Sequence, residues 1–240
     1  MGQLKKRIKA DAQHKTPAIV ATHGISAPPR SSLIETRQWI MISSMDTCSP
    51  SEEQPAAIRE NLRVGMVRPH MRDIPDVPFP AGYGMRLLRR DEGPLWLEIE
   101  RDAEQWSSID DDYFAKEFGV DPEGIEQRCY FVVNPDGEAI GTISAWYTDY
   151  HGENCGRLHW FAIRPAYQGR GLGRPVMSFF LHRLAQLHPC AYLITSTARL
   201  PALKLYLDYG FLPDLELPDA LDAWRKVKEV LPHPALDAIE

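Results

Sequence analysis

The sequence lacks several features that would place it in a specialised class of protein. No apolar run approaches the roughly 18 residues of a membrane-spanning helix, which argues against an integral membrane protein. The 4 cysteines lie far apart without a Cys-x-x-Cys pair, so neither a zinc site nor a dense disulfide framework is indicated. We therefore expect no metal and a reducing, cytoplasmic location. What is present is ordinary for a globular protein: 240 residues, 44% hydrophobic and 25% charged.

The net charge of −6 is unevenly distributed along the chain. Residues 1–40 carry seven Lys/Arg and two acids, which is +5 and leaves −11 for the remainder. Residues 91–126 alone hold thirteen acids and two Lys/Arg. An acidic body disfavours nucleic acid as a partner and favours a cationic one, although acidic surfaces are also common as plain solvated faces.

Residues 1–80 predict a poorly ordered leader, because they hold nine prolines and show no sustained helical or strand period up to about residue 78. The basic residues near the start are followed by Asp11 and Gln13 rather than an apolar stretch, which does not indicate a secretory signal. Met41, Met45 and Met66 are further potential starts, and we hypothesise that part of the leader is a misassigned reading frame. A basic leader that tethers the protein to an anionic surface is the alternative.

Residues 81–240 have regular patterns and predict a single mixed α/β domain. Strands and helices follow in β-α-α-β-β-β-α-β-α-β order, with an amphipathic segment at 218–231. About 160 residues can bury enough surface to fold without metals or disulfides. The expected elements are strand 83–89, helices 94–106 and 113–118, strands 128–133, 139–147 and 157–163, helix 174–188, strand 191–197, helix 201–209 and strand 211–217.

A glycine-rich stretch, Gln168-Gly-Arg-Gly-Leu-Gly173, lies between the strand at 157–163 and the following helix. The first N–H groups of a helix are unpaired and coincide with the positive end of its dipole, which favours a phosphate. The dinucleotide pattern G-x-G-x-x-G fails, because Arg174 stands where its third glycine would be, and the P-loop pattern is absent. A turn that needs positive φ would explain the glycines without any ligand.

Two motifs in this order resemble the GNAT family of acyl-CoA-dependent N-acyltransferases. The first is Gln168-x-x-Gly171-x-Gly173 after a strand that ends in Ala162-Ile163-x-Pro165, similar to the family's acyl-CoA-binding motif. The second is Ala202-x-x-x-Tyr206-x-x-x-Gly210-Phe211, similar to its fourth helix and the next strand. The resemblance covers residues 82–217. It implies a central mixed, mostly antiparallel sheet flanked by helices, here with an irregular N-terminal extension, and acetyl transfer from acetyl-CoA, as co-substrate, to a primary amine.

The resemblance also implies how acetyl-CoA is held. Backbone amides of the glycine turn would bind the pyrophosphate, and the main chain of the preceding strand would pair with the pantetheine arm. The two arginines of the turn would add positive charge, unless they are only solvated. The implied acetyl-CoA-binding residues are Phe161, Ala162, Ile163, Gln168, Gly169, Arg170, Gly171, Leu172, Gly173 and Arg174.

His159 and Tyr206 are the expected catalytic residues. An alkylamine with a pKa of about 10.4 is mostly protonated at pH 7, so a proton acceptor accelerates its attack. His159 matches the second histidine of the H-x-H pair in the arylalkylamine branch of the family, with Arg157 in place of the first. Tyr206 matches the helix-four tyrosine that donates a proton to the leaving sulfur. A strand histidine and a core tyrosine with purely structural roles are the alternatives.

The acceptor is expected to be a small-molecule or protein amine of unknown identity. In the family the first two helices build much of the acceptor pocket, and here they fall in the acidic 91–126 segment. Asp110, Asp111 and Asp112 could attract an amine or cap the helix at 113–118. Cys155 is expected to be a bystander. A non-catalytic acyl-CoA sensor or interaction module is the alternative function, and the oligomeric state stays open, a homodimer included.

Overall fold

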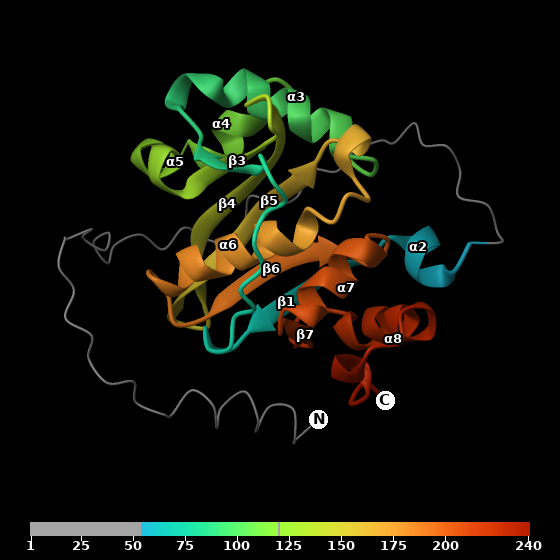
Figure 1. Cartoon of the computed structure of the whole chain (residues 1–240). Coiled ribbons are helices and arrows are strands. Elements are labelled where there is room, and N and C mark those ends of the chain that lie inside the picture. The colour runs from blue at the N-terminus through green and yellow to red at the C-terminus, as the bar shows by residue number, and fades with distance from the viewer. Residues whose placement is uncertain (1–53, 120) are drawn as a thin grey trace.

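A seven-stranded sheet flanked by helices forms the centre of the computed structural model, which describes residues 54–119 and 121–240 (Figure 1). The strand order is β2-β3-β4-β5-β6-β1-β7, and all neighbours are antiparallel except β5 and β6, which are parallel. The expected mixed, mostly antiparallel α/β sheet is confirmed. The strands are β1 (Arg63–Arg68), β2 (Gly84–Leu87), β3 (Cys129–Val133), β4 (Ala139–Tyr150), β5 (Glu153–Ile163), β6 (Ala191–Ser196) and β7 (Leu212–Asp214).

The helices form two groups that cover different parts of the sheet: α3–α5 lie together on one side in Figure 1, and α6 crosses the middle of the sheet. Alternate residues of β3 enter two separate buried clusters, because successive side chains of a strand point to opposite faces. Helices α3–α5 supply one cluster and α6–α8 the other. Among the described helices, none is long and apolar enough to span a bilayer. The α-helices are α2 (Ala56–Glu60), α3 (Gly93–Ala103), α4 (Tyr113–Phe118), α5 (Pro122–Arg128), α6 (Gly173–Ala185), α7 (Leu200–Asp208) and α8 (Ala220–Val230).

Helix α5 was not among the expected elements. Asp121 precedes it and accepts a hydrogen bond from the backbone N–H of Gly124 at 2.9 Å, and Pro122 occupies the first turn. These are ordinary helix-start residues, but the helix has only 7 residues and two buried ones, so it shows almost no periodicity.

Strand β1 corrects the prediction of a leader that extends to residue 80. It pairs with β6 along its whole length and with β7 on its other side, and its Val64 and Met66 are fully buried. The prediction is therefore wrong for the described residues from 54 onward, whereas residues 1–53 lie outside the described part of the chain. The apolar run of β1 is short and lies among prolines, and such a run has too few residues to reveal a period.

The segment between β1 and β2 is also part of the domain. It runs across α6 in Figure 1, where the Ser178 hydroxyl donates to the carbonyl of Pro75 at 2.8 Å and accepts from the N–H of Val77 at 3.1 Å. The buried guanidinium of Arg68 donates to the carbonyls of Tyr209 and Arg72. The proline-rich sequence here thus forms a fixed connection that spans the helix layer.

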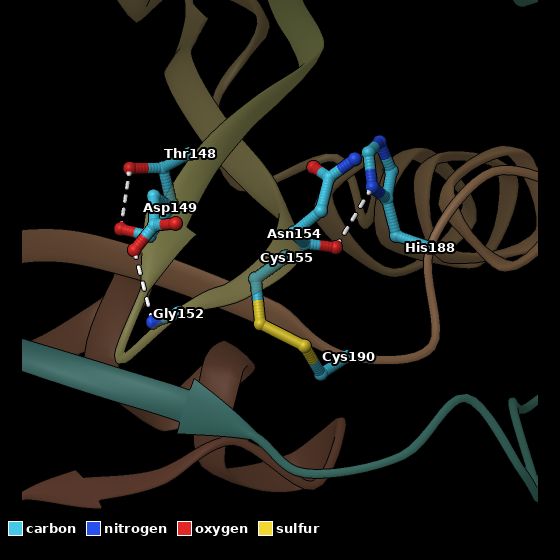
Figure 2. Close-up of a disulfide and its surroundings, with 7 residues drawn as sticks. All are labelled: Thr148, Asp149, Gly152, Asn154, Cys155, His188 and Cys190. Atoms are coloured by element: carbon cyan, nitrogen blue, oxygen red, sulfur yellow. Dashed lines mark hydrogen bonds between the residues drawn. A yellow bond between two sulfur atoms is a disulfide. The ribbon is translucent and has the colours of Figure 1, made fainter. Parts of the chain in front are cut away.

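The two parallel strands in the middle of the sheet separate soon after they meet. Strands β5 and β6 pair only at Gly156 with Ala191 and at Arg157 with Tyr192. A Cys155–Cys190 disulfide joins the two segments beside this point, with the Cα atoms 5.1 Å apart (Figure 2). Beyond Arg157 the strands diverge, so the edge of β5 that leads to the glycine turn is not covered by β6.

The disulfide differs from the expectation of unpaired cysteines in a reducing compartment. Cys155 is bonded to Cys190 and so has no free thiol beside the site, whereas Cys129 is free and buried. Sequence spacing could not reveal the pair, because parallel pairing of β5 with β6 brings together two residues that are 35 positions apart. Disulfides are typical of oxidising compartments, so the cysteines give no support for a cytoplasmic location.

A chain that starts at residue 81 should fail to fold, whereas a chain that starts at residue 54 should melt cooperatively like the full-length protein. Without β1 the strands β6 and β7 lose the strand that lies between them. Circular dichroism during a thermal melt measures both chains. A cooperative melt of the shorter chain at an unchanged temperature would contradict the assignment of β1 to the domain.

Reduction of the disulfide should lower the free energy of unfolding by about 3–4 kcal/mol, because the bridge closes a loop across a separation of 35 residues. Urea titration of the protein with and without a reducing agent measures the loss. Cys190→Ser should show the same loss and no response to the reducing agent. Equal stability of the wild type in both conditions would mean that the bridge does not form.

Candidate active site

The glycine turn sits at the start of α6 and has the conformation that its sequence predicts. Gly169 and Gly171 have φ values of +72° and +76°, a region that favours glycine. A Cβ atom at either position would have no heavy atom within 4 Å, so the space beside both residues is open. The first amides of α6 have no acceptor within the helix. The turn therefore offers backbone donors and room for a phosphate group.

The side chains of the turn serve the turn itself. Gln168 donates to the carbonyl of Ile163 at 2.8 Å, and Leu172 is buried in the core. Arg170 donates to the carbonyl of Ala166 at 2.9 Å, and Arg174 lies 3.9 Å from a carboxylate oxygen of Asp208. Both guanidinium groups also lie over tyrosine rings. Their charge is near the turn, whereas Leu172 can contribute only through its backbone.

Strand β5 contains a bulge just before the turn. The register of β4 and β5 shifts between Thr142 and Ser144, and Trp160 has a φ of +51°, which is rare for a residue with a side chain. Phe161, Ala162 and Ile163 follow the bulge, and the last two pair with β4. The predicted acetyl-CoA-binding residues 161–163 thus lie on the stretch of β5 that has diverged from β6.

His159 lies one residue before the bulge and is 5% exposed. Its Nε2 is 3.0 Å from an Oε2 atom of Glu117 on α4, which also accepts from the indole N–H of Trp160 at 3.0 Å. Burial lowers the pKa of His159 to about 4, although the hydrogen bond to Glu117 opposes this shift. Burial alone would raise the pKa of Glu117, but the hydrogen bonds hold it below its ordinary value. The pair is therefore a neutral imidazole that donates to a carboxylate.

Tyr206 lies on α7, where its ring packs at 6.1 Å from that of Phe211 and is 5% exposed. Burial raises the pKa of its phenol above the ordinary value; Arg199 opposes the shift and Glu100 adds to it. The phenol is therefore protonated at neutral pH. Arg199 and Glu100 are therefore the charged residues that act on the Tyr206 phenol in this structure.

Glu100 on α3 and Glu104, the C-cap residue of that helix, were not among the site residues predicted from the sequence. Glu100 is 3% exposed and accepts a hydrogen bond from the hydroxyl of Thr142 on β4. Glu104, one turn later, binds Arg199 through both oxygens, at 2.7 and 2.9 Å. Burial raises the pKa of Glu100 to about 8; Thr142 opposes the shift, Glu104 adds to it and Arg199 opposes it. Their four-residue spacing on a largely apolar helix face was the signal available in the sequence.

Two of the three aspartates between α3 and α4 form ion pairs with basic residues of the same region. Asp110 pairs with Lys116 and Asp111 with Arg101, each at 2.6 Å. Asp112 holds the N-cap position of α4 without a side-chain capping bond. These pairings favour a role in local structure over attraction of an amine. Within the described residues, no group of three or more His, Cys, Asp or Glu side chains is arranged to hold a metal ion.

Comparison with known proteins places these features in one family. The family model described as "Acetyltransferase (GNAT) family" matches residues 85–211. Two curated proteins named mycothiol acetyltransferase are 31% identical to the chain: one from Thermomonospora curvata over 148 residues and one from Streptomyces bingchenggensis over 152. The matches cover 58% and 60% of this chain and 47% of each relative, so the chain spans about half the length of these relatives.

Among solved structures, an acetyltransferase of the GNAT family from Colwellia psychrerythraea has the same fold. The two structures superimpose with a TM-score of 0.50 at 12% sequence identity, and the match covers 63% of this chain and 52% of the Colwellia chain. The family match extends over more than half of the chain and includes β2 to β6, the glycine turn and α7. The chain belongs to the GNAT acetyltransferase family.

Proposed function

We propose that the protein transfers an acetyl group from acetyl-CoA to a primary amine. One observation carries this proposal: the open glycine turn before α6 is joined by the short 3-10 helix Pro165–Tyr167 to the stretch of β5 that has separated from β6. The pyrophosphate would bind the amides of residues 169–174, and the pantetheine arm would lie along the main chain of residues 161–163. No side chain of the turn fills the space beside Gly169 or Gly171, so the residues present fit the group.

Acetyl-CoA supplies an activated thioester, and the residues of this chain bind it, orient it and move protons. Tyr206 is proposed to donate its phenolic proton to the sulfur as the thiolate leaves. The proposal is supported by the position of Tyr206 on α7 near Glu100 and Arg199 and by the protonated state of its phenol at neutral pH. A thiolate with a pKa of about 8.5 leaves readily, and a nearby acid still assists it.

The acceptor is proposed to be a small molecule with a primary amine. The relatives are named mycothiol acetyltransferase, which supports acetyl transfer in general and leaves the acceptor of this chain open. Because Asp110 and Asp111 are already paired, the buried Glu100 of α3 is the stronger candidate for contact with an amine.

His159 remains a prediction as the direct base. Its imidazole is neutral at pH 7, but a group with a pKa of about 4 is a weak proton acceptor. Its Nε2–H bond to Glu117 holds α4 against β5, so the structure supports a positioning role at least as well.

The low pKa of His159 predicts how the free energy of unfolding depends on pH. The unfolded chain binds a proton near pH 6.5, whereas the folded state resists it down to about pH 4, so the contribution of His159 to stability should fall as pH falls through this range. Thermal melts of the wild type and His159→Gln between pH 4 and 8 measure the effect, and the variant should lack this component. A difference in stability between the wild type and His159→Gln that stays constant over that window would indicate an ordinary pKa and would favour the role of base.

Purified protein should release CoA thiol from acetyl-CoA when primary amines are added. The assay uses a panel of diamines, polyamines, amino sugars and peptide amino termini, with thiol release and the acetylated product measured together. Tight acetyl-CoA binding without thiol release for any amine would instead favour the sensor function.

Tyr206→Phe should lower kcat at least about tenfold and leave the acetyl-CoA dissociation constant within twofold, because only the proton donor is removed. Tyr130→Phe is the matched control, since it also removes a hydroxyl from a buried tyrosine, one that contacts Arg183 away from α7. An unchanged kcat in Tyr206→Phe would exclude the phenol as the acid.

A further inference from the structure

Glu100 lies where the bulge of β5, the middle of β4 and helix α7 approach one another. The hydroxyl of Thr142 donates to Glu100, and the same hydroxyl oxygen is 3.2 Å from the carbonyl oxygen of Trp160, the bulge residue. Glu100 is therefore one side chain away from the strand along which the thioester is proposed to lie. On its other side Glu100 interacts electrostatically with Arg199 and Tyr206.

The surroundings of Glu100 favour the uncharged acid over the carboxylate. Burying a carboxylate is costly unless it is well hydrogen-bonded. Among the described residues, Glu100 has one hydrogen-bond donor, the hydroxyl of Thr142, whereas the buried Glu117 has two. Arg199 could compensate the charge, but both of its hydrogen bonds to a carboxylate go to Glu104. A carboxyl group kept poorly compensated in a closed site is a liability for folding and is more typical of functional sites.

Thr142 allows Glu100 to exist in both protonation states. A threonine hydroxyl can donate one hydrogen bond and accept others. When Glu100 is ionised, Thr142 donates to it; when Glu100 is protonated, the acid can donate to Thr142, whose own proton can turn to the carbonyl of Trp160. A proton can thus arrive at Glu100 without leaving a buried group unsatisfied.

We propose that the carboxylate of Glu100 accepts the proton of the acceptor amine during acetyl transfer. The inference rests on the proposed function. The amine nitrogen forms a bond to the acetyl carbon, the carbon–sulfur bond breaks, the amine proton passes to Glu100 and the phenolic proton of Tyr206 passes to the sulfur. Glu100 then returns a proton to Tyr206 by way of solvent, and the net products are the acetamide and free CoA. The Glu104–Arg199 pair positions the start of α7 against α3.

The proposal predicts that kcat/KM rises as pH increases through about 8, the pKa of Glu100, because only the carboxylate can take a proton. At pH 7 roughly one molecule in ten carries the active form. The charged and titratable groups that act on Glu100 are Glu104 at the C-cap of its own helix, Arg199 at the N-cap of α7, Tyr206 on α7 and Tyr113 on α4. Tyr113 and Tyr206 have raised pKa values and stay neutral across this range.

The test compares kcat/KM from pH 6 to 10 for the wild type, Glu100→Gln and Glu100→Asp, with the best amine of the panel. Glu100→Gln should lose about 100-fold at pH 8 and the step near pH 8 should vanish. Glu100→Asp keeps a carboxylate and should retain part of the activity together with a pH step. Glu98→Gln, an exposed position on the same helix that pairs with Arg164, is the matched control and should stay within twofold of the wild type.

Thermal stability separates a role in catalysis from a role in structure. The folded state holds a proton on Glu100 that the unfolded chain has released, so the stability of the wild type relative to Glu100→Gln should fall as pH rises from about 4.5 to 8. Glu100→Gln has no charge to bury, and its Tm at pH 8 should equal or exceed that of the wild type while its activity is lost. A large drop in Tm would instead assign Glu100 a structural role and overturn the proposal.

Other outcomes also decide the question. If Glu100→Gln keeps the wild-type kcat/KM and pH profile, the inference about Glu100 is overturned while the proposed function stands. The same holds if His159→Gln loses the pH step and Glu100→Gln retains it. A wild type that releases no thiol with any amine overturns the proposed function, and this inference with it.

Discussion

The separation of β5 from β6 is the constraint on which the candidate site depends. The two strands pair at only two positions, and a disulfide joins the chain segments beside them. Past that point β5 bulges, continues along β4 and ends in the glycine turn that begins α6. Backbone groups at a strand edge and at a helix start both seek hydrogen-bond partners. A long ligand with amide groups and a phosphate can therefore be held mainly by main-chain atoms, with little demand on side-chain identity.

The helices on one face of the sheet bury two acids, and their different surroundings give them opposite properties. Glu117 receives hydrogen bonds from His159 and Trp160, so its pKa lies below the ordinary value. Glu100 receives one from Thr142, so burial dominates and its pKa rises. The number of donors decides whether a buried carboxyl group is a structural anion or a group that can exchange a proton near neutral pH. His159 supplies one of these donors, which connects it to the site even if it takes no proton itself.

The residues that match the family model do not include every strand of the sheet. The family match covers residues 85–211, whereas β1 lies before it and α8 after it. Strand β1 nevertheless lies between β6 and β7, and α8 contributes the fully buried Trp224 to the core. Segments at both ends of this chain therefore support a site that the shared part contains.

The sequence by itself determined the fold class, most of the elements from residue 83 onward and the glycine turn, because these depend on local periodicity, on turn chemistry and on two motifs of fixed spacing. It also indicated residues 161–163 and Tyr206 as parts of one site. Only the tertiary structure decided that β1 belongs to the sheet, that Cys155 meets Cys190, and that Glu100 lies beside Thr142 and α7. Each of these depends on contacts between residues far apart in the chain, and the protonation of a buried acid depends on the donors that surround it, which spacing alone does not reveal.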